Sequence, residues 1–574
     1  MKKISSLLLL VLLLAGCYED LGNYDYTLDS MNEITAVTFT PSVVRSASGD
    51  IIEVQQALDE SDTRRRVDAV VEQTLAQDLE ALEFYWFRTY ADENGEAVQD
   101  TVRTKGYLEF DLPVGKAMSY NVFLQIYDST TDLSHYSGFT IKTRPVFKNS
   151  LFVMHGSDGN RKIGNIEVVG NETKIYTDVK KVTKDNNHYE NATGFAYTTY
   201  INIPDNLTNI GETSALTVFC NNGETRAYDP HGMNVKFTSS QIFKPESENF
   251  SYRKTVQTGD PSNYTLYKVA LTDNGEVYVG NVVQALYKPG HGCENAVDVG
   301  HQTDYEITAA TITHNRFLMW DAKNGRFLYA AKEDGGFAID EGNSIKPSYV
   351  SRNPLLDAHV RFQGLQRSPA DMTAVMGYIN YRDNYSQQNP YFIFKDEESG
   401  DYYRYELLMQ NIGDGSKVRR SRTADGEEEI LSAYTIVGEK KLTGLTPTDM
   451  STITYNSWFT TTNLFFAEGN TVYRYNVSNG DKFVVYEAPE GYDVTKIKFR
   501  TEDSSAFSSD LGLYLDIVLF NGTSGAVAEI KFTTAADVDT DFAPLLYDKD
   551  NDGNPWEEIK DIIFVNEYAY EMVY

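Results

Sequence analysis

The residues that most often carry chemistry are scarce in this chain. Its 574 residues include only three cysteines, four tryptophans and eight histidines. Basic residues are also few: 51 Lys and Arg stand against 83 Asp and Glu, for a formal net charge of −32. A surface this acidic repels phosphate backbones, so we expect no nucleic-acid partner. No second long apolar run follows residue 14, so any contact with a membrane is expected at the N-terminus alone.

Common catalytic signatures are missing as well. The sequence has no G-x-S-x-G, no H-E-x-x-H, no glycine-rich phosphate loop and no Asp-box repeat (Ser-x-Asp-x-Gly-x-Thr-Trp) of the sialidase type. Carboxylates are so abundant that some pair falls at a glycosidase-like separation by chance. We therefore name no catalytic residue, and we expect a non-enzymatic protein without an organic cofactor.

The first residues have the pattern of a secretory signal peptide. Lys2 and Lys3 precede a short apolar stretch, residues 4–14, and small residues lead to Cys17. The stretch is too short for a stable membrane span with these flanks. Leu-Ala-Gly before Cys17 resembles the lipobox of bacterial lipoproteins, which implies removal of residues 1–16 and acylation of the Cys17 thiol and amine. An ordinary secretory signal with a chance cysteine is the alternative.

Acidic residues follow the cysteine directly. The stretch Tyr18-Glu19-Asp20 resembles the surface-export signal of Bacteroidetes lipoproteins. That resemblance implies an outer-membrane protein that faces the extracellular side. Several acyl chains hold a folded domain on a bilayer stably, so membrane contact through the lipid anchor alone is expected.

The composition favours β-structure, and we predict an all-β fold. Forty Tyr and 29 Phe accompany many Val, Ile and Thr. After a tether at residues 17–33, residues 34–145 contain alternating runs such as "EITAVTFTP" and "LEFYWFRTY", which predict an antiparallel sandwich with Trp86 between its sheets. The stretch "DESDTRRRVDAVVEQTLAQDLEAL" is left open between a helix and long strands.

The end of this region resembles a known module. "YNVFLQIYDSTTDLSHYSGFTIKT" resembles the last strands of a PKD-type immunoglobulin-like domain. With the "GCYEDLGNYDY" start, the first quarter of the chain resembles the PKD-like lipoproteins of Bacteroidetes. The resemblance implies an accessory lipoprotein that works beside SusC/SusD-type transporter proteins and captures a nutrient, either a glycan or a peptide.

Residues 146–574 repeat one pattern seven times. An apolar strand, a polar turn with Gly and a second strand recur about every 60 residues, with Gly or Asn supplying the positive φ of the turn. The copies are residues 151–169, 216–229, 267–281, 316–331, 391–407, 464–477 and 516–532. Such a recurrence predicts a β-propeller of six to eight blades, most simply seven, in which each copy forms the middle of a four-stranded blade. Unrelated hairpins in a sandwich-like domain are the alternative. We expect the C-terminal strands to complete the first blade.

One motif has the spacing of a cation site. Asp548, Asp550 and Asp552 alternate before Gly553, as in the first half of an EF-hand loop. The twelfth position is Ile559, where a bidentate Glu belongs, and no flanking helices are expected. The stretch is therefore either a Ca²⁺ site or an exposed acidic turn.

The remaining cysteines and a histidine pair give two further candidates. In an exported protein, Cys220 and Cys293 form a disulfide or stay separate thiols. His291, Cys293 and His301 lie in one stretch, "HGCENAVDVGH", which is either a metal site or an ordinary loop.

Two tryptophans are candidate platforms for sugar stacking. Trp320 ends an apolar strand and is expected to pack in the core. Trp458, in "YNSWFTTTN", lies just before a hairpin and is the better candidate for a ligand platform.

Three functions remain open. The first is a surface lipoprotein that binds a glycan or peptide for a SusC/SusD-type import system. The second is a propeller hydrolase or lyase acting on polysaccharide, and the third is a purely structural subunit of the transporter complex.

Overall fold

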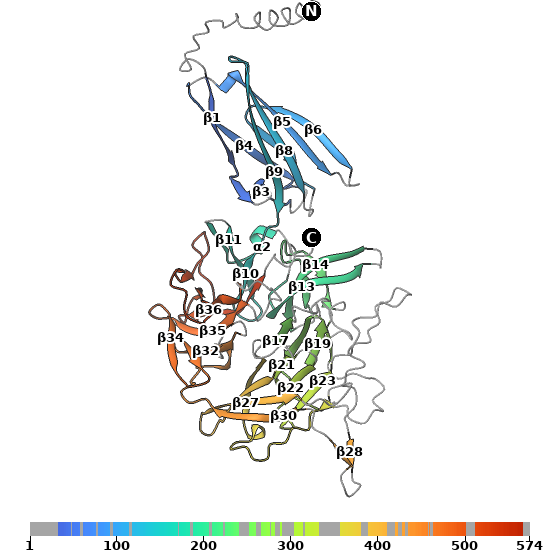
Figure 1. Ribbon diagram of the computed structural model, residues 1–574, viewed down its shortest axis with the longest axis vertical. Coiled ribbons are helices and arrows are strands. Elements are labelled where there is room, and N and C mark those ends of the chain that lie inside the picture. The colour runs from blue at the N-terminus through green and yellow to red at the C-terminus, as the bar shows by residue number, and fades with distance from the viewer. Residues whose placement is uncertain are drawn as a thin grey trace, which may run out of the picture. The chain divides into compact units, whose positions relative to one another are not determined.

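The computed structural model shows an all-β chain that divides into two compact units, one ending at Val146 and one starting at Phe147 (Figure 1). The structure describes residues 32–565 apart from short gaps and the longer segments 240–251, 260–265, 290–303, 332–355, 380–388, 410–419 and 501–510. None of the helices in these described ranges combines the length and the apolarity that crossing a bilayer requires.

The first unit consists of two sheets that enclose a common core. The three-stranded antiparallel sheet contains β1 (Ile34–Thr40), β4 (Arg64–Gln73) and β7 (Tyr107–Asp111). The six-stranded sheet runs in the order β2 (Val43–Ser46), β3 (Gly49–Gln55), β9 (Leu133–Arg144), β8 (Ser119–Asp128), β5 (Leu82–Ala91) and β6 (Ala97–Thr104). Its pairs are antiparallel except β3 with β9. A short 3-10 turn, η2 (Leu79–Ala81), precedes β5.

Alternation along the strands produces this sandwich. In β8, Tyr120, Val122, Leu124 and Ile126 are buried, and the residues between them face outward. Trp86 is fully buried in the core, as predicted, and its Nε1 donates a hydrogen bond to the Thr104 hydroxyl at 3.1 Å. In "DESDTRRRVDAVVEQTLAQDLEAL", the described residues form strand β4 and the turn η2 and no α-helix.

The second unit contains seven four-stranded antiparallel sheets within the described residues. In strand order, the first sheet is β12 (Glu172–Tyr176), β11 (Lys162–Val169), β10 (Ser150–His155) and β39 (Ile559–Val565), and the second is β13 (Ala192–Asp205), β14 (Asn209–Cys220), β15 (Arg226–Tyr228) and β16 (Val235–Phe237). The third is β17 (Tyr252–Gly259), β18 (Leu266–Thr272), β19 (Val277–Asn281) and β20 (Tyr287–Pro289), the fourth is β21 (Ile307–Thr313), β22 (Arg316–Asp321), β23 (Arg326–Ala331) and β24 (Leu356–Asp357), and the fifth is β25 (Thr373–Ile379), β26 (Pro390–Lys395), β27 (Tyr402–Met409) and β30 (Tyr434–Lys441). The sixth is β31 (Ile453–Tyr455), β32 (Asn463–Glu468), β33 (Thr471–Asn476) and β34 (Lys482–Glu487), and the seventh is β35 (Asp493–Phe499), β36 (Tyr514–Phe520), β37 (Gly525–Lys531) and β38 (Leu545–Tyr547).

Smaller elements connect these sheets. They are α2 (Lys180–Thr183), the 3-10 turns η3 (Pro369–Asp371), η4 (Met450–Thr452) and η6 (Leu511–Leu513), and a two-stranded hairpin of β28 (Arg420–Arg422) and β29 (Glu428–Ile430).

Each predicted hairpin forms the two middle strands of one of these sheets. The reason is burial on both faces: all six residues of β10 are buried, and so are the five central residues of β36. Glycine makes two of the turns possible, because Gly325 and Gly400 have φ values of +60° and +74°. The unit is therefore a propeller-like β domain, and the alternative of unrelated hairpins is not supported.

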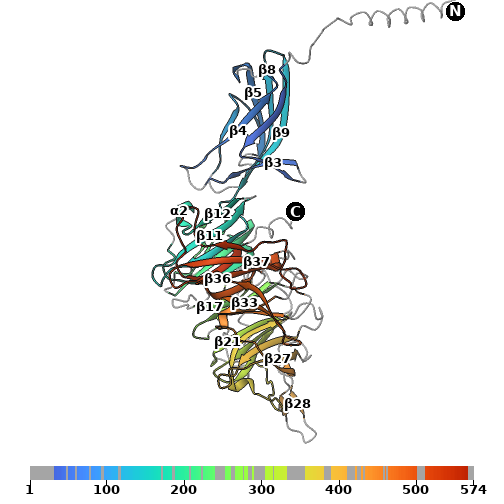
Figure 2. The same ribbon diagram turned by 90° about the vertical axis from the view of Figure 1, so that its left-hand side faces the viewer.

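The ends of this unit are joined by strand pairing. β39 near the C-terminus pairs antiparallel with β10 at its beginning, in the register Ser150 with Val565 through His155 with Ile559. Figure 2 shows the C-terminal strands, in red, beside the β10–β12 sheet. The expected completion of the first sheet by the C-terminus is confirmed.

Buried charges reinforce this closure. Asp561 of β39 accepts a hydrogen bond from the Lys496 ammonium of β35 at 2.8 Å and another from the backbone N–H of Phe195 in β13 at 3.0 Å. One carboxylate thus connects three strands of three different sheets. Burial alone would raise the pKa of Asp561, but attraction to Lys496 and Lys498 outweighs it and lowers that pKa.

Candidate ligand-binding face

The outer face of the six-stranded sheet in the first unit carries aromatic side chains where polar ones are usual. Phe87 of β5 and Phe123 of β8 are directly paired across the two strands. Both occupy the outward phase of strands whose inward phase builds the core around Trp86. One further strand along, Tyr136 of β9 pairs with Gln125 of β8. Three neighbouring strands therefore place three aromatic rings on one surface.

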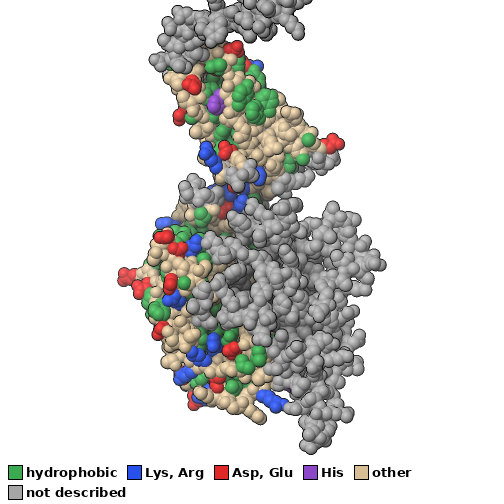
Figure 3. All heavy atoms as spheres, viewed as in Figure 1, with side chains coloured by type: hydrophobic (Ala, Val, Ile, Leu, Met, Phe, Trp, Pro, Cys, Tyr) green, Lys and Arg blue, Asp and Glu red, His purple; other side chains and the backbone are tan. Residues whose placement is uncertain are grey.

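These rings form a connected group that is open to solvent. The ring centroids of Phe87 and Phe123 lie 6.3 Å apart, and those of Phe123 and Tyr136 lie 5.5 Å apart in a nearly parallel arrangement. Phe123 is 47% exposed and Tyr136 is 54% exposed. Figure 3 shows hydrophobic side chains at the surface of this unit among mostly polar ones.

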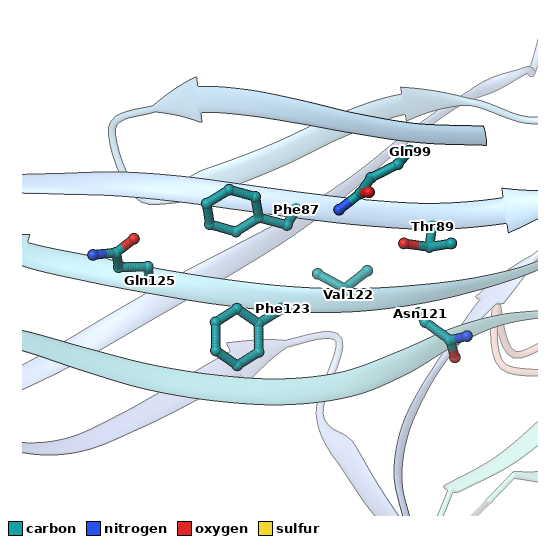
Figure 4. Close-up of a pocket in the computed structure, with 7 residues that line it drawn as sticks. All are labelled: Phe87, Thr89, Gln99, Asn121, Val122, Phe123 and Gln125. Atoms are coloured by element: carbon teal, nitrogen blue, oxygen red, sulfur yellow. The ribbon is translucent and has the colours of Figure 1, made fainter. Parts of the chain in front are cut away.

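Neutral polar groups surround the rings and define a shallow hollow of about 470 Å³. Its lining comprises Phe87, Thr89, Gln99, Asn121, Val122, Phe123 and Gln125. Figure 4 shows the two phenylalanine rings side by side, with Gln125 at one end and Thr89, Asn121 and Gln99 at the other. This volume lies in the usual range of small-molecule sites. We call the lining residues together with Tyr136 the aromatic face.

The amides of the aromatic face retain hydrogen-bonding capacity. The Gln125 Nε2 donates to the Ser134 hydroxyl at 3.0 Å and to the Tyr136 hydroxyl at 3.5 Å, and its carbonyl oxygen remains an acceptor. The Asn121 Oδ1 accepts from the Thr140 hydroxyl at 3.3 Å, and its amide nitrogen remains a donor. Together these groups can donate to and accept from a ligand.

Charges lie beside the hollow but compensate each other. An ion pair at 2.6 Å joins Arg103 of β6 and Glu83 of β5, both of which lie on strands that line the hollow. The Arg103 guanidinium also lies 5.3 Å from the ring centroid of Tyr85. The lining itself contains no charged residue.

The aspartate motif of the C-terminal region forms a structural turn. Asp548 and Asp552 are exposed, whereas Asp550 is buried and its carboxylate accepts hydrogen bonds from the backbone N–H of Asn554 at 2.8 Å and from the Thr177 hydroxyl at 2.7 Å. Among the described residues, no group of three His, Cys, Asp or Glu side chains is arranged to hold a metal ion. The central carboxylate is satisfied by the chain itself, which fits the alternative of an acidic turn, while a Ca²⁺ site at Asp548, Asp550 and Asp552 stays a prediction.

This turn is held against the sheet that contains β10 and β39. The Asn551 side chain accepts from the backbone N–H of Ile175 at 2.6 Å and donates to the Thr173 carbonyl at 3.2 Å, which fixes the turn on strand β12. Burial works to raise the pKa of Asp550, yet the hydrogen bonds from Asn554 and Thr177 outweigh it and lower that pKa to about 2. Gly553 has a φ of +86°, which explains the glycine at this position.

A second carboxylate cluster lies in the core of the last sheet. The Arg500 guanidinium forms ion pairs with Asp516 at 2.9 Å and with Glu529. Burial raises the pKa of Glu529, and Arg500 pulls in the opposite direction. All three side chains are nearly inaccessible, so the cluster offers no surface to a substrate.

Cys220 is a free, buried cysteine at the end of β14, which matches the alternative of separate thiols. Its backbone N–H donates to the Thr225 hydroxyl at 2.9 Å, and burial raises the pKa of its thiol to about 12. Cys293 lies outside the described residues, and so do Cys17, His291 and His301.

The two weighed tryptophans have separate outcomes. Trp320 is 1% exposed and packs edge-on against Phe327 and Phe394 at centroid distances of 4.8 and 4.9 Å, so the expected core role is confirmed. Trp458 lies outside the described residues, and its role as a platform stays a prediction.

The aromatic face was missed at the level of sequence, although one signal was present. In "SYNVFLQIYD" the buried residues alternate from Tyr120 to Ile126, and Phe123 stands in the opposite phase. An aromatic residue out of phase with the core of a half-buried strand marks an exposed ring.

Comparison with protein families gives one match. Residues 17–198 match the PKD-like family, which confirms the PKD-like resemblance of the first unit and extends it through β10, β11 and β12 into β13. No curated protein is significantly similar to the chain.

Solved structures give only distant similarities. A quinonprotein alcohol dehydrogenase-like protein from Bacteroides thetaiotaomicron is 8% identical, with 90% of this chain and 96% of that chain covered and a TM-score of 0.36. Synechocystis apocarotenoid oxygenase is 8% identical over 74% of this chain and 93% of that chain, with a TM-score of 0.37. AztD from Citrobacter koseri is 8% identical over 84% and 98%, with a TM-score of 0.30. Similarities this weak carry no argument about activity.

Proposed function

We propose that this protein is a lipid-anchored binding protein of the bacterial cell surface that captures a nutrient, a glycan or a peptide, for a SusC/SusD-type import system. The observation that carries the proposal is the aromatic face: a solvent-open hollow lined by aromatic rings and neutral amides. Exposed apolar groups rimmed by polar side chains are typical of interaction sites. The PKD-like match over residues 17–198 supports an accessory role.

The proposed architecture follows the two units. Residues 34–145 form a PKD-like, immunoglobulin-like sandwich that presents the aromatic face. Residues 146–574 form a seven-bladed propeller, in which each four-stranded sheet is a blade and β39 completes the first one. The pairing of β39 with β10 and the burial of Asp561 support this assignment.

The proposed location depends on the lipobox-like residues before Cys17. Acylation there anchors the protein in the outer membrane, and Tyr18-Glu19-Asp20 directs it to the outer face. Mass spectrometry of the natural protein is expected to find a triacylated N-terminal cysteine, and protease added to intact cells is expected to degrade the protein. An unmodified thiol at Cys17, or a protein free in the periplasm, would contradict this part of the proposal.

A binding assay separates the three candidate functions. Residues 18–574 are incubated with polysaccharides and with peptides, and both retention and product formation are measured. Retention without turnover is the expected result. Turnover of a polysaccharide would instead indicate the hydrolase or lyase alternative. Co-purification with a transporter, without retention of any ligand, would indicate a purely structural subunit.

A further inference from the structure

We infer that the aromatic face binds a neutral glycan chain, and that it selects this class over acidic polysaccharides and peptides. The inference rests on the proposed capture function and names its ligand. It places recognition on the outer surface of strands β5, β8 and β9, a site that the sequence did not indicate.

The arrangement of the rings suits an extended ligand. Phe87, Phe123 and Tyr136 belong to three adjacent strands, so the line that joins them runs across the sheet. Their centroids follow one another at 6.3 and 5.5 Å. A pyranose ring has C–H groups on its faces and hydroxyl groups around its edge. Linked pyranoses can therefore meet successive rings with their faces while their hydroxyls reach the amides.

The polar groups of the hollow match hydroxyl groups. A sugar hydroxyl both donates and accepts, and so do the amides of Gln99, Asn121 and Gln125 and the Thr89 hydroxyl. The Gln99 side chain forms no hydrogen bond to any described residue, so its amide donors and its carbonyl acceptor are available to a ligand. Few fixed polar groups around an apolar floor are the usual means of orienting a small ligand.

Charge excludes acidic glycans. The lining carries no charged side chain, and the neighbouring Arg103 is already paired with Glu83. A uronate or sulfate ester within the lining would lose its hydration without gaining a cation there, because Lys142 stands on β9 beyond the Asn121 end of the hollow. The net charge of −32 over the whole chain adds a general repulsion of polyanions.

Strand pairing argues against a peptide. β8 pairs with β5 and β9, β5 also pairs with β6, and β9 also pairs with β3. Because their backbone groups are engaged on both sides, none of these strands can accept a peptide as an added strand. A peptide would have to bind by its side chains alone.

The test uses residues 18–574 and defined polymers. Galactomannan, xylan and mixed-linkage β-glucan are the neutral probes, polygalacturonate is the acidic probe, and a tryptic digest of casein supplies peptides. Retention is measured by affinity electrophoresis for the polymers, and dissociation constants by calorimetry for oligosaccharides and peptides. Phe87→Ala, Phe123→Ala and Asn121→Ala are compared with Phe483→Ala, whose ring on β34 is 45% exposed and thus matches Phe123. Far-ultraviolet circular dichroism confirms that each variant is folded.

The expected result is retention by at least one neutral polymer, weakened about tenfold or more by Phe87→Ala and Phe123→Ala and unchanged by Phe483→Ala. Asn121→Ala keeps all rings and is expected to weaken binding less, by about threefold to tenfold.

Three results would overturn the inference, and they differ in whether they also contradict the proposed capture function. Neutral binding that is unaffected by Phe87→Ala and Phe123→Ala would place the site elsewhere and leave the capture function intact. Binding of polygalacturonate or casein peptides alone would refute the neutral class, again without refuting capture. Retention of none of the probes would remove both the inference and the proposed function.

Discussion

The carboxylate of Asp561 offers the sharpest test of how the propeller-like unit is closed. It lies on β39, which is contributed by the C-terminus, and it reaches Lys496 on β35 and the backbone N–H of Phe195 on β13. Replacement by alanine removes the acceptor for both groups at once. The Lys496 ammonium and a buried N–H are then left without this partner.

The magnitude follows from the burial of the pair. Removing one partner of a buried ion pair costs about 3–5 kcal/mol in the free energy of unfolding. Lys496 is 28% exposed, so its ammonium can reach some water, and the expected loss is at the lower end, about 3 kcal/mol. Lys496→Met in the same chain is expected to restore about 1–2 kcal/mol, because it removes the uncompensated charge.

The assay combines urea unfolding with hydrogen exchange. Asp561→Ala is expected to lower the urea midpoint of the propeller-like unit and to reduce amide protection first in β39 and β10, the strands that close the sheet. The control is Asp537→Ala, which removes an ion pair with Arg474 whose carboxylate is 65% exposed, and it is expected to cost about 0–1 kcal/mol. If Asp561→Ala were as mild as this control, or if protection fell elsewhere before β39, the buried charge would not be part of the closure.

Three further changes test separate features by thermal and urea unfolding. Because the folded-state pKa of Asp550 is lowered to about 2, the carboxylate stabilises the fold above its usual pKa of 3.8, and this contribution is lost as the pH falls from about 4 to 2. Asp550→Asn should flatten this pH dependence of stability. An unchanged acid profile in the variant would contradict the prediction. Burial lowers the pKa of His155 below its usual 6.5, and the neutral Nδ1 accepts a hydrogen bond from the backbone N–H of Glu557. Stability should therefore decrease as the pH falls below about 6.5. His155→Gln should remove this decrease. Gly164→Ala should destabilise by about 1–3 kcal/mol, since an added Cβ would lie 2.3 Å from the Trp556 ring and 2.5 Å from the backbone oxygen of Tyr176; a neutral effect would show that both the ring and strand β12 shift freely.

The repeated hairpins could be predicted from sequence because they depend on local signals. A doubly buried strand such as β36 is a continuous apolar run, and a turn at Gly325 or Gly400 needs a residue that accepts positive φ. The shortest outer strands gave no such signal. β24 has two residues and β16 and β38 have three, so they are defined by pairing with a neighbour and not by their own sequence.

The aspartate motif shows where local reasoning fails. Alternating Asp residues before Gly553 resemble a cation loop by spacing, but the partners of Asp550 include Thr177, which is 373 positions earlier in the chain. Spacing cannot reveal a partner at that separation. In the structure the Asp550 carboxylate contacts a hydroxyl, an amide and the neighbouring Lys181 ammonium at 3.7 Å.

The aromatic face was hidden for the same reason, since Phe87 and Phe123 meet only through the register of β5 with β8. The core does not need these rings, because Trp86 and Leu124 are buried by the inward-facing residues of the sandwich and the rings of Phe87 and Phe123 lie on the other side of the sheet. A half-buried sheet is usually polar on its solvent side, and exposed rings carry a cost in solubility. Exposed rings that contribute little to folding, gathered beside amides that keep spare donors and acceptors, are therefore best explained by contact with a ligand. On this argument Phe123→Ala should leave the unfolding of the first unit nearly unchanged while it weakens binding, and a large loss of stability would show that the ring is part of the fold.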